Sequence, residues 1–568
     1  MPYRWLREEN IKSIPEMFEA MAGKMGRKTA LIYYGNKISY QKVWSLSRGL
    51  AYYIRLFTQS SDRVAIFMPN IPQFVFCYYG TLAAKRIAVP INFISIANAM
   101  KSKNGNDIKI TDEIKSQLLD SKPAVIFVAD FLYPALTQVK INWPCNIVVA
   151  SPGDFLPFFL RLLYPIKTKH DKKYVAVPKT VMRLEEIMDS LSGHIPKLES
   201  IDPDTVAQFQ YTGGTTGNPK AAMLTHRNLV NNVLQVREHF GDILKDGEEV
   251  VMAALPLFHI YGMTTCLNAT MLSLGGQLLL MPAFDPKSAI RNIAKYKVSV
   301  FPGVNRMYQS MVGCKDLMAA TDLSSLKLCV SGAGPIDDRI CNAFREITKN
   351  LAITEGYGLS ETSPAVAVTL PEYLSKPRAK GFIGRAVPGT TIKIAGENGK
   401  ELPAGEIGEI TVLGPQVMKG YFNNDVETKN VLNDGWFKTG DMGYMDDEGF
   451  CYFTDRLKDV IKVMGENIYA SEIEKRLMLD PLIREAVVVG VPDIKKGEVP
   501  VALIVLAKDC RNDHNFEKNI RMSLAGAHPY YNPSQIIVMD SLDQFKNPIG
   551  KISKVNIKKY LEKLQPQH

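Results

Sequence analysis

Residues Tyr211–Lys220 read YTGGTTGNPK, and this stretch decides how the rest of the chain is interpreted. Glycine lets the backbone approach a ligand closely, and successive N–H groups can converge on anionic oxygens. Thr212, Thr215 and Thr216 add hydroxyl donors and Lys220 adds a positive charge, so the stretch predicts a cradle for a polyphosphate. The spacing differs from G-x-x-x-x-G-K-[ST], which excludes the P-loop. An ordinary Gly/Thr turn is the alternative, and ten positions of this composition argue against it.

The segments around this loop alternate between β-branched runs and helical patterns, which predicts parallel α/β sheets. A strand at Val206–Tyr211 precedes the loop and a helix at His226–His239, capped by Thr225, follows it. The loop is therefore expected at a strand–helix junction. Further strands are predicted at 63–68, 87–91, 124–129, 147–150, 250–255, 277–281, 299–302, 326–331 and 352–355. After about Lys376, glycines separate short strand-like runs, which indicates antiparallel strands. A smaller α+β unit begins near Asp459.

The composition is that of a folded globular protein. Of the 568 residues, 46% are hydrophobic and 22% charged, with a formal net charge of +10, which excludes disordered, collagen-like and disulfide-scaffold classes. The eight cysteines include no C-x-x-C pair and indicate buried thiols in a reducing compartment. The N-terminus carries charges throughout and lacks the apolar core of a secretory signal. The positive charge is not gathered in a basic tail, so no nucleic-acid partner is expected.

Two apolar stretches raise the question of membrane contact. Val250–Phe284 holds no Asp, Glu, Lys or Arg, but Pro256, His259 and Gly275 are among the residues that interrupt it. Strand, loop, buried helix and strand therefore fit it better than a membrane span. Phe155–Lys169 reads FLPFFLRLLYPIKTK, which fits either a helix packed on the domain or an element that binds a membrane surface reversibly.

At Phe209–Asn228 the chain reads FQYTGGTTGNPKAAMLTHRN, which resembles the signature of the adenylate-forming superfamily of acyl-CoA synthetases, peptide-synthetase adenylation domains and luciferases. Within it, the chain most resembles bacterial long-chain fatty-acid–CoA ligases. Matching motifs follow in collinear order: PLFH at 256–259, SGAGP at 331–335, EGYGLSET at 355–362, WFKTGD at 436–441, DRLKD at 455–459 and GK at 550–551. Each motif alone is weak, but the ordered set is specific.

The resemblance implies an α/β fold in two parts. A large N-terminal domain of doubly wound α/β subdomains plus a small β-barrel-like subdomain precedes a small mobile α+β C-terminal domain. The expected boundaries are 1–454 for the first domain, with subdomains of about 1–200, 201–375 and 376–454, then a hinge at 455–458 and the second domain at 459–568.

The resemblance also implies the reaction. A fatty acid, expected to be long-chain, is activated by ATP to acyl-AMP with release of pyrophosphate, and the acyl group then passes to the thiol of CoA. Because the substrate carboxylate is itself the nucleophile, the protein needs no Ser/His/Asp triad. It positions the reactants and stabilises charge. The implied cofactors are ATP, Mg²⁺ and CoA.

Roles for individual residues are carried over from the family motifs. The implied catalytic residues are Lys551, Glu361, Lys220 and His259, with Glu361 as the metal ligand. The residues implied to bind the nucleotide are Thr212, Gly213, Gly214, Thr215, Thr216, Gly217, Lys220, Gly332, Ala333, Gly334, Pro335, Tyr357, Gly358, Ser360, Asp441, Arg456 and Lys551. Tyr357 is expected to pack on adenine, and Asp441 with Arg456 to engage the ribose. For His259, a satisfied core residue is the alternative; His226 is expected to be structural.

The resemblance also implies that the two half-reactions use two arrangements of the C-terminal domain. By resemblance, Asp455 and Lys458 form the hinge, and rotation exchanges Lys551 for Gly465, Glu466 and Asn467 on the CoA side.

Two alternatives to a CoA ligase stay open. One is an acyl-AMP ligase that loads a carrier-protein phosphopantetheine, motivated by unusual thiol-side residues such as Ala470. The other is a degenerate ligase that only binds nucleotide or lipid. The expected location is cytoplasmic, or peripheral at the inner face of a membrane through about 155–169, and the oligomeric state, monomer or homodimer, is left open.

Overall fold

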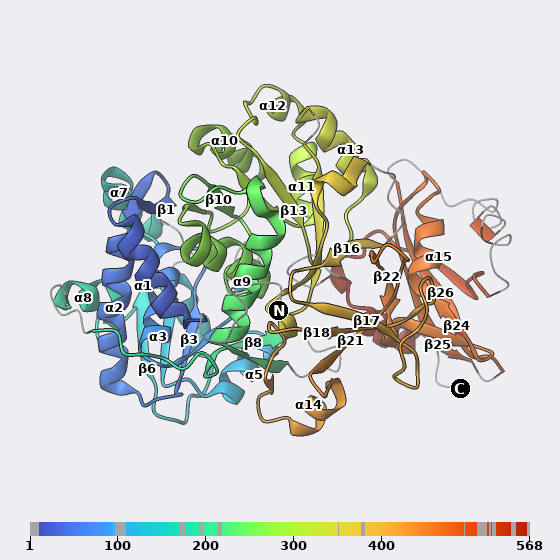
Figure 1. Cartoon of the computed structure of the whole chain (residues 1–568), viewed down its shortest axis with the longest axis horizontal. Helices are drawn as coiled ribbons and strands as arrows, with labels where there is room; N and C mark the ends of the chain where they lie inside the picture. The colour runs from blue at the N-terminus through green and yellow to red at the C-terminus, as the bar shows by residue number, and fades with distance from the viewer. Residues whose placement is uncertain are drawn as a thin grey trace. The chain divides into compact units, whose positions relative to one another are not determined.

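The computed structural model describes residues 11–94, 96, 110–170, 177–191, 197–212, 219–349, 351–375, 381–493, 495–507, 520–521, 524, 530–546 and 552–564 (Figure 1). The chain divides into two compact units. The first comprises Met1–Arg378, Ile383–Thr391 and Val412–Phe437. The second comprises Ala379–Phe382, Ile392–Thr411 and Lys438–His568.

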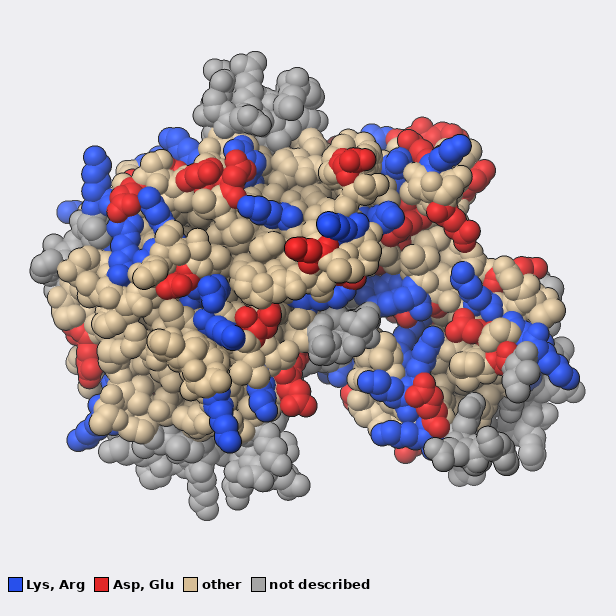
Figure 2. Space-filling view, turned by 90° about the horizontal axis from the view of Figure 1, so that it is seen from below, with Lys and Arg blue, Asp and Glu red and all other residues tan. Residues whose placement is uncertain are grey.

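Charged side chains of both signs are distributed over the surface. Figure 2 shows Lys and Arg interspersed with Asp and Glu over most of the face that it presents. The net charge of +10 is therefore not gathered into one broad field on this face.

One sheet of the first unit carries the phosphate-loop segment. Its eight strands lie in the order β19-β9-β8-β4-β3-β5-β6-β7. The bounds are β3 Arg63–Phe67, β4 Ile87–Pro90, β5 Val125–Ala129, β6 Asn146–Ala150, β7 Met182–Arg183, β8 Val206–Thr212, β9 Lys220–Thr225 and β19 Gly420–Tyr421. Strands β3 to β8 pair in parallel, whereas β9 runs antiparallel to both β8 and β19. Every residue of β5 is buried, as expected for an interior parallel strand.

Amphipathic and buried helices accompany this sheet. They are α1 Ile14–Met25, α2 Tyr40–Phe57, α3 Pro72–Ala83, α5 Asp112–Ser121, α6 Tyr133–Leu136, α7 Phe158–His170, α8 Leu184–Ser190 and α9 His226–Phe240. All twelve residues of α3 are buried, so its apolar sequence reflects a core position. The predicted cap of α9 is confirmed, because the Thr225 side chain and the Asn228 side chain each accept the other residue's main-chain N–H.

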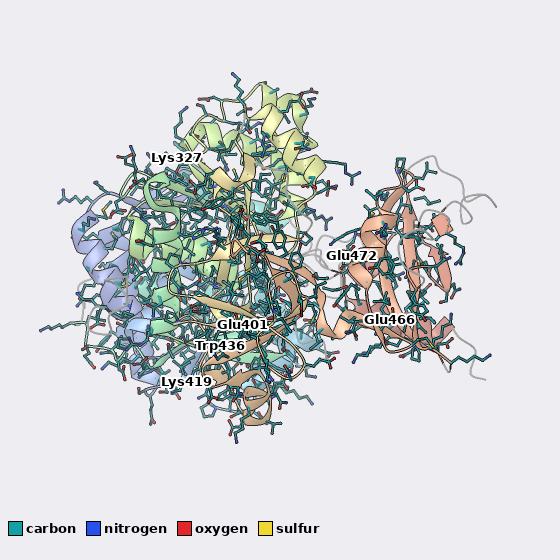
Figure 3. All side chains as sticks on the ribbon, turned by 45° about the vertical axis from the view of Figure 1, so that its right-hand side comes forward. Lys327, Glu401, Lys419, Trp436, Glu466 and Glu472 are labelled. Carbon is teal, nitrogen blue, oxygen red and sulfur yellow. The ribbon has the colours of Figure 1, made fainter. Side chains whose placement is uncertain are left out.

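In the second sheet, the strands that belong to the first unit lie in the order β15-β14-β13-β12-β10-β11-β1-β2. The bounds are β1 Thr29–Tyr33, β2 Asn36–Ser39, β10 Val250–Ala253, β11 Gln277–Leu280, β12 Val300–Gly303, β13 Leu328–Ser331, β14 Ile353–Gly358 and β15 Ala365–Val368. Its helices are α10 Pro286–Tyr296, α11 Asn305–Val312, α12 Lys315–Ala319 and α13 Asp338–Ile347. Strands β10 to β14 are mutually parallel. Lys327, before β13, is labelled in Figure 3. It pairs at 2.8 Å with Glu249, a fully buried residue before β10.

The uncharged stretch Val250–Phe284 has the predicted arrangement of strand, loop, buried helix and strand. Between β10 and β11 lies a helix of the wide π type, Gly262–Leu274, in which most residues are buried. Gly262 is required at its start, because a Cβ there would lie 2.4 Å from the Pro256 carbonyl oxygen. Among the helices of the described residues, none combines the length and the apolar character that crossing a bilayer demands.

The second unit is built mainly of antiparallel strands. β17 Thr391–Ala395, β18 Gly408–Leu413, β21 Trp436–Met445 and β22 Cys451–Arg456 are followed by a five-stranded sheet. This sheet contains β23 Val460–Val463, β24 Glu466–Tyr469, β25 Ile483–Asp493, β26 Gly497–Leu506 and β27 Gln535–Val538, with α15 Ala470–Leu477 and α17 Lys554–Leu564. The turn at 446–449 joins the paired strands β21 and β22, which confirms the antiparallel strands expected after about Lys376.

Candidate active site

The predicted phosphate loop lies between the two strands of a β-hairpin. Strands β8 and β9 pair antiparallel up to Thr212 opposite Lys220, so both ends of the loop are fixed side by side. The expectation of a strand–helix junction is therefore wrong: Lys220–Thr225 forms a strand before α9 begins. The missed strand is short and Ala-rich, and its pairing with β8 decides its conformation. Gly213, Gly214, Thr215, Thr216 and Gly217 lie outside the described residues.

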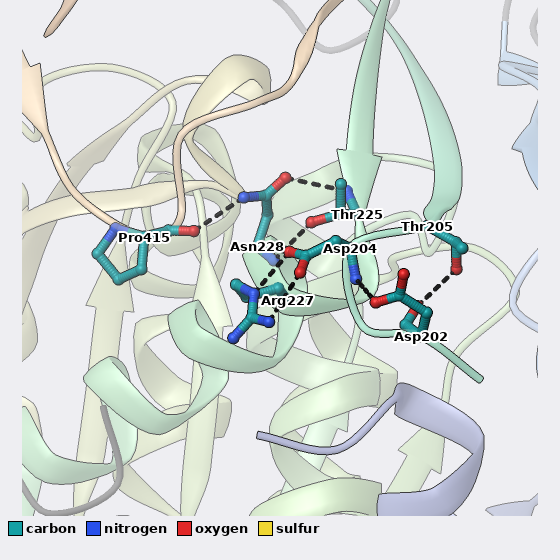
Figure 4. A network of polar contacts seen from close by, with 7 residues as sticks. All are labelled: Asp202, Asp204, Thr205, Thr225, Arg227, Asn228 and Pro415. Carbon is teal, nitrogen blue, oxygen red and sulfur yellow. Dashed lines mark hydrogen bonds and ion pairs between the residues drawn. The ribbon is translucent and has the colours of Figure 1, made fainter. Parts of the chain in front are cut away.

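The N-terminus of α9 fixes a second segment close to this hairpin (Figure 4). The Asn228 side-chain amide donates to the Pro415 carbonyl at 2.8 Å, and Arg227 pairs with both oxygens of Asp204 at 2.6 and 2.8 Å. A few residues beyond Pro415, β19 pairs with β9, with Tyr421 opposite Ala222. The chain from 415 to 421 is thereby anchored beside the strand that begins with Lys220.

Lys220 lines a pocket of about 300 Å³ with Asp120, Phe422, Asn423 and Asn424. Its ammonium forms a close ion pair with Glu427, on α14 Asp425–Val431, and lies 5.4 Å from the centre of the Tyr421 ring. The Lys220 hydrogen bond holds the pKa of Glu427 below its usual value, so Glu427 is charged at neutral pH.

Glu361, the predicted metal ligand, lies in the turn Ser360–Thr362 directly after β14 and is only 9% exposed. The Tyr421 hydroxyl donates to its Oε1 at 2.9 Å, and the Glu361 carbonyl accepts the Met418 N–H at 2.8 Å. Burial, and then the charge of Glu361, raise the pKa of Tyr421, so this hydroxyl stays protonated as a donor. Tyr421 therefore contacts both candidates: its ring lies near the Lys220 ammonium, and its hydroxyl binds Glu361. Tyr421 belongs to none of the motifs that identified the other candidates, so it was not predicted from the sequence.

The remaining nucleotide-site candidates of the first unit gather at one edge of the second sheet. Because β10, β12, β13 and β14 are parallel, the segments that follow them meet at their carboxyl ends. This edge is the usual ligand position in open α/β sheets. It carries His259 after β10, Gly332–Pro335 after β13, and Tyr357, Gly358 and Ser360 at the end of β14.

Backbone requirements explain several of these residue types. A Cβ at Gly358 would lie 1.9 Å from the Pro364 carbonyl oxygen, and one at Gly332 would lie 2.9 Å from the Tyr261 ring. Ala333 has φ of 65°, a conformation that costs energy for any residue with a Cβ. Ala333, Gly334 and Pro335 are exposed, so this strained turn presents its backbone at the sheet edge.

His259 is half-buried and takes part in a hydrogen bond within its own turn. Its Nδ1 accepts the Tyr261 N–H at 3.2 Å, which leaves Nε2 to carry the proton in the neutral ring. Tyr261 in turn donates to the Val330 carbonyl at 3.1 Å and packs against Gly332. His259 is therefore tied to the SGAGP turn. His226, by contrast, is buried and accepts the Ile14 N–H at 3.4 Å, as expected for a structural residue.

In the second unit, strand pairing brings Asp441 and Arg456 together. The two residues are opposite each other on β21 and β22, and Arg456 Nε lies 3.5 Å from Asp441 Oδ1. Asp441 is 4% exposed, so its carboxylate is shielded from water on most sides. The pair offers a carboxylate and a guanidinium on one face.

The predicted hinge and CoA-side residues also lie in the second unit. Asp455 is buried and accepts the Ser471 N–H at 2.8 Å, whereas Lys458 is exposed in the turn Leu457–Asp459. Gly465 (φ 88°), Glu466 and Asn467 are exposed where β24 turns back from β23 (Figure 3). Gly465 suits this tight turn, because positive φ is costly for other residues.

Lys551 lies outside the described residues. Just after it, Ile552 bridges Lys546, and Lys554 at the start of α17 pairs with Glu474 at 2.9 Å. Glu474 also accepts the Val488 N–H at 2.8 Å. Burial lowers the pKa of Lys554, but Glu474 and Asp455 outweigh it, so the net shift is upward and Lys554 is charged.

Comparison with known proteins identifies the family. The model for the AMP-binding enzyme family matches residues 18–422, and the model for the C-terminal domain of AMP-binding enzymes matches residues 472–551. The long-chain-fatty-acid–CoA ligase of Bacillus subtilis is 37% identical over 548 residues, 95% of this chain and 93% of that protein. The ligase of the same name from Salmonella typhimurium is 33% identical and covers 96% of this chain and 94% of its own.

Solved structures agree on the fold. ATP-bound MatB from Rhodopseudomonas palustris superposes with a TM-score of 0.79 at 25% identity, covering 97% of this chain and 99% of its own. The anthranilate–CoA ligase AuaEII in complex with anthranoyl-AMP has the same TM-score at 20% identity. The expected mixed α/β fold of adenylate-forming ligases is therefore confirmed.

Proposed function

The chain belongs to the AMP-binding enzyme family, and from this premise we propose that it is an ATP-dependent long-chain fatty-acid–CoA ligase. The observation that carries the substrate class is its identity of 37% over 95% of its length to one such ligase. A fatty-acid oxygen attacks the α-phosphorus of ATP, the bond to the bridging oxygen breaks, and pyrophosphate leaves with the electron pair. The CoA sulfur then attacks the acyl carbonyl, and AMP leaves with its oxygen.

In the first unit, Lys220 and the preceding loop hold the departing phosphates, and Tyr357 with Gly332–Pro335 binds the base. The positions of these residues at a β-hairpin and at the carboxyl ends of parallel strands support the assignment. His259, with the proton on Nε2, can donate to the acyl carboxylate. Fixed donors of this kind stabilise charge without reorganising during the reaction.

Glu361 fits the chemistry of Mg²⁺. This ion takes oxygen ligands, and in nucleotide sites it is bound by one or two carboxylates with substrate phosphates and water. Glu361 supplies one buried carboxylate, oriented by Tyr421. In the described part of the chain, no cluster of three His, Cys, Asp or Glu could bind a metal alone, which suits a site completed by substrate. The ion, when bound, neutralises phosphate charge.

The second unit supplies the remaining groups. Asp441 and Arg456 engage the ribose hydroxyls, and Lys551 places a positive charge at the reacting phosphate and carboxylate. Asp455 and Lys458 act as the hinge, and Gly465, Glu466 and Asn467 serve the CoA step. The half-buried pair Lys554–Glu474 supports this proposal, because it anchors the chain three residues beyond Lys551.

A carboxylate panel tests the proposed function. Purified protein is incubated with ATP, Mg²⁺ and saturated acids of increasing length, with and without CoA, and pyrophosphate, AMP and acyl-CoA are each quantified. We expect pyrophosphate and acyl-AMP without CoA, and acyl-CoA with free AMP once CoA is added. Adenylate without acyl-CoA would instead support a carrier-protein acceptor. If ATP binds but no acid yields pyrophosphate, AMP or acyl-CoA, the result would support a degenerate ligase.

Helix α7 supports a second component, reversible attachment to a membrane surface. The described part of the stretch starts with Phe155 packed on Phe76 at 5.1 Å between ring centres. Further along, the side chains of Phe158, Phe159, Leu160, Leu162 and Leu163 are 45–77% exposed, which supports a membrane-surface element. Arg161 and, in sequence, Lys167 and Lys169 suit an anionic interface. Each buried Leu or Phe contributes about 1.5–3 kcal/mol.

Vesicle co-sedimentation tests this component. Wild type is compared with Phe158→Ser/Phe159→Ser/Leu162→Ser on vesicles with and without anionic lipid, and we expect the triple variant to stay in the supernatant. Tyr34→Ser/Leu413→Ser, at exposed positions off α7, is the control. Equal binding of the triple variant and wild type would remove the membrane role.

A cytoplasmic location accords with the seven described cysteines, all free thiols.

A further inference from the structure

Lys220 already has an anionic partner in the protein itself. Its ammonium pairs with the Glu427 carboxylate, which is 207 residues away in the sequence. Both side chains are partly exposed, 24% for Lys220 and 32% for Glu427, so a ligand entering from solvent can reach the pair. The lysine proposed to hold phosphates thus has a carboxylate partner within the protein.

Glu427 is held in place by its own helix. Its N–H donates to the Asn424 side chain at 3.2 Å, which caps α14, and its Oε2 accepts from the Asn430 amide at 3.5 Å. The Tyr421 N–H donates to Thr428 Oγ1 at 2.9 Å, which ties α14 to β19. Since β19 pairs with β9, Glu427 and Tyr421 are both anchored relative to Lys220.

Two anions compete for one ammonium in this arrangement. The ammonium has three N–H donors, so a carboxylate and a phosphate oxygen can both bind Lys220, but the two anions repel each other and share one positive charge. Glu427 therefore weakens the attraction between Lys220 and a bound triphosphate or pyrophosphate.

We propose that Glu427 is a competing counter-ion for Lys220, which lowers the affinity of the site for ATP phosphates and for pyrophosphate and thereby promotes pyrophosphate release. Glu427 acts through Lys220 and contacts neither reacting atom, so it is a positioning residue. The proposal rests on the proposed function only in that Lys220 binds phosphate.

The test compares Glu427→Gln with wild type. Glutamine keeps the shape and the contact with Asn430 but removes the charge. We expect the KM for ATP and the inhibition constant for pyrophosphate to fall by the same factor, roughly 1.5- to 5-fold, as for the loss of one partly exposed ion-pair partner. Direct calorimetric titration of the free protein with pyrophosphate should show the same factor. Asp425→Asn, which removes an exposed charge from the same helical turn, is the control and should change neither constant.

The outcomes separate the two proposals. Unchanged or weaker pyrophosphate affinity in a folded Glu427→Gln protein would overturn the counter-ion role and leave Glu427 as a structural residue. An equal effect of Asp425→Asn would also overturn it, because the cause would then be general charge. A wild-type protein that binds neither ATP nor pyrophosphate would overturn the phosphate role of Lys220 as well. Glu427→Asp, which retains the charge, should keep affinities within twofold of wild type if the shorter side chain still reaches Lys220, and its melting temperature reports any loss of folding.

Discussion

Replacing Tyr421 by Phe removes one hydroxyl from the centre of the candidate site and little else. The hydroxyl donates to Glu361 Oε1 at 2.9 Å, in a position where Glu361 is only 9% exposed. The Phe ring keeps the contact below Lys220, and β19 keeps its main-chain pairing with β9. The variant therefore separates the orientation of Glu361 from the binding of phosphate.

The expected effect follows from the strength of that hydrogen bond. A hydrogen bond to a charged group contributes about 1.5–3 kcal/mol, and 1.4 kcal/mol corresponds to a factor of about ten. We therefore expect the adenylation rate at limiting Mg²⁺ to fall by roughly 10- to 100-fold. The Mg²⁺ concentration for half-maximal rate should rise, and excess Mg²⁺ should restore part of the activity.

The assay is pyrophosphate release from ATP and a fatty acid, titrated with Mg²⁺, beside transfer from supplied acyl-AMP to CoA, which should be unaffected. Tyr53→Phe is the control, since its hydroxyl donates to the weak acceptor Met182 Sδ at 3.2 Å and, within the described residues, to no stronger one. A Mg²⁺ dependence within twofold of wild type, in a protein with an unchanged melting temperature, would refute the orienting role of Tyr421.

Three further predictions concern other parts of the molecule. Lys551→Ala should lower adenylation by roughly 10²–10³ or more and spare transfer from supplied acyl-AMP; equal loss in both half-reactions would contradict this division. Gly358→Ala should lower the free energy of unfolding by about 1–3 kcal/mol or more, because its Cβ would meet the Pro364 carbonyl at 1.9 Å, whereas Gly334→Ala, with open space, should be neutral in the same melts. Burial lowers the pKa of His226 to about 3 in the folded protein. In the unfolded chain this residue is protonated as the pH falls below about 6.5, whereas in the folded protein it stays neutral until about pH 3. The contribution of neutral His226 to the free energy of unfolding is complete above pH 6.5 and falls as the pH drops toward 3, with a loss of about 2 kcal/mol at pH 5. His226→Gln should abolish that part of the pH dependence of urea unfolding.

The sequence allowed most buried strands of the first unit to be predicted, because runs such as Val125–Ala129 and Val250–Ala253 are apolar and β-branched. Their periodicity and length distinguish them from the helices between them. Strand β9 was missed, since a short Ala-rich segment next to a helix cap has no strand pattern of its own, and its conformation follows from pairing with β8.

Residues recognised by a motif were easier to predict than residues recognised by position. Glu361, Asp441 and Arg456 each belong to a motif, and strand register then explains why Asp441 meets Arg456. Tyr421 and Glu427 carry no such motif. They reach Lys220 only because β19 pairs with β9 across about 200 residues of chain, a contact that no local pattern encodes.

The most direct test of the central claim follows the oxygen atoms of the acid. A fatty acid labelled with ¹⁸O in both carboxylate oxygens is converted with ATP and CoA, and AMP is recovered for mass spectrometry. If the carboxylate attacks the α-phosphorus, one labelled oxygen appears in AMP and the other remains in the thioester. Unlabelled AMP, or label found in inorganic phosphate together with ADP, would contradict an acyl-adenylate and with it the roles proposed for Lys220 and Glu361.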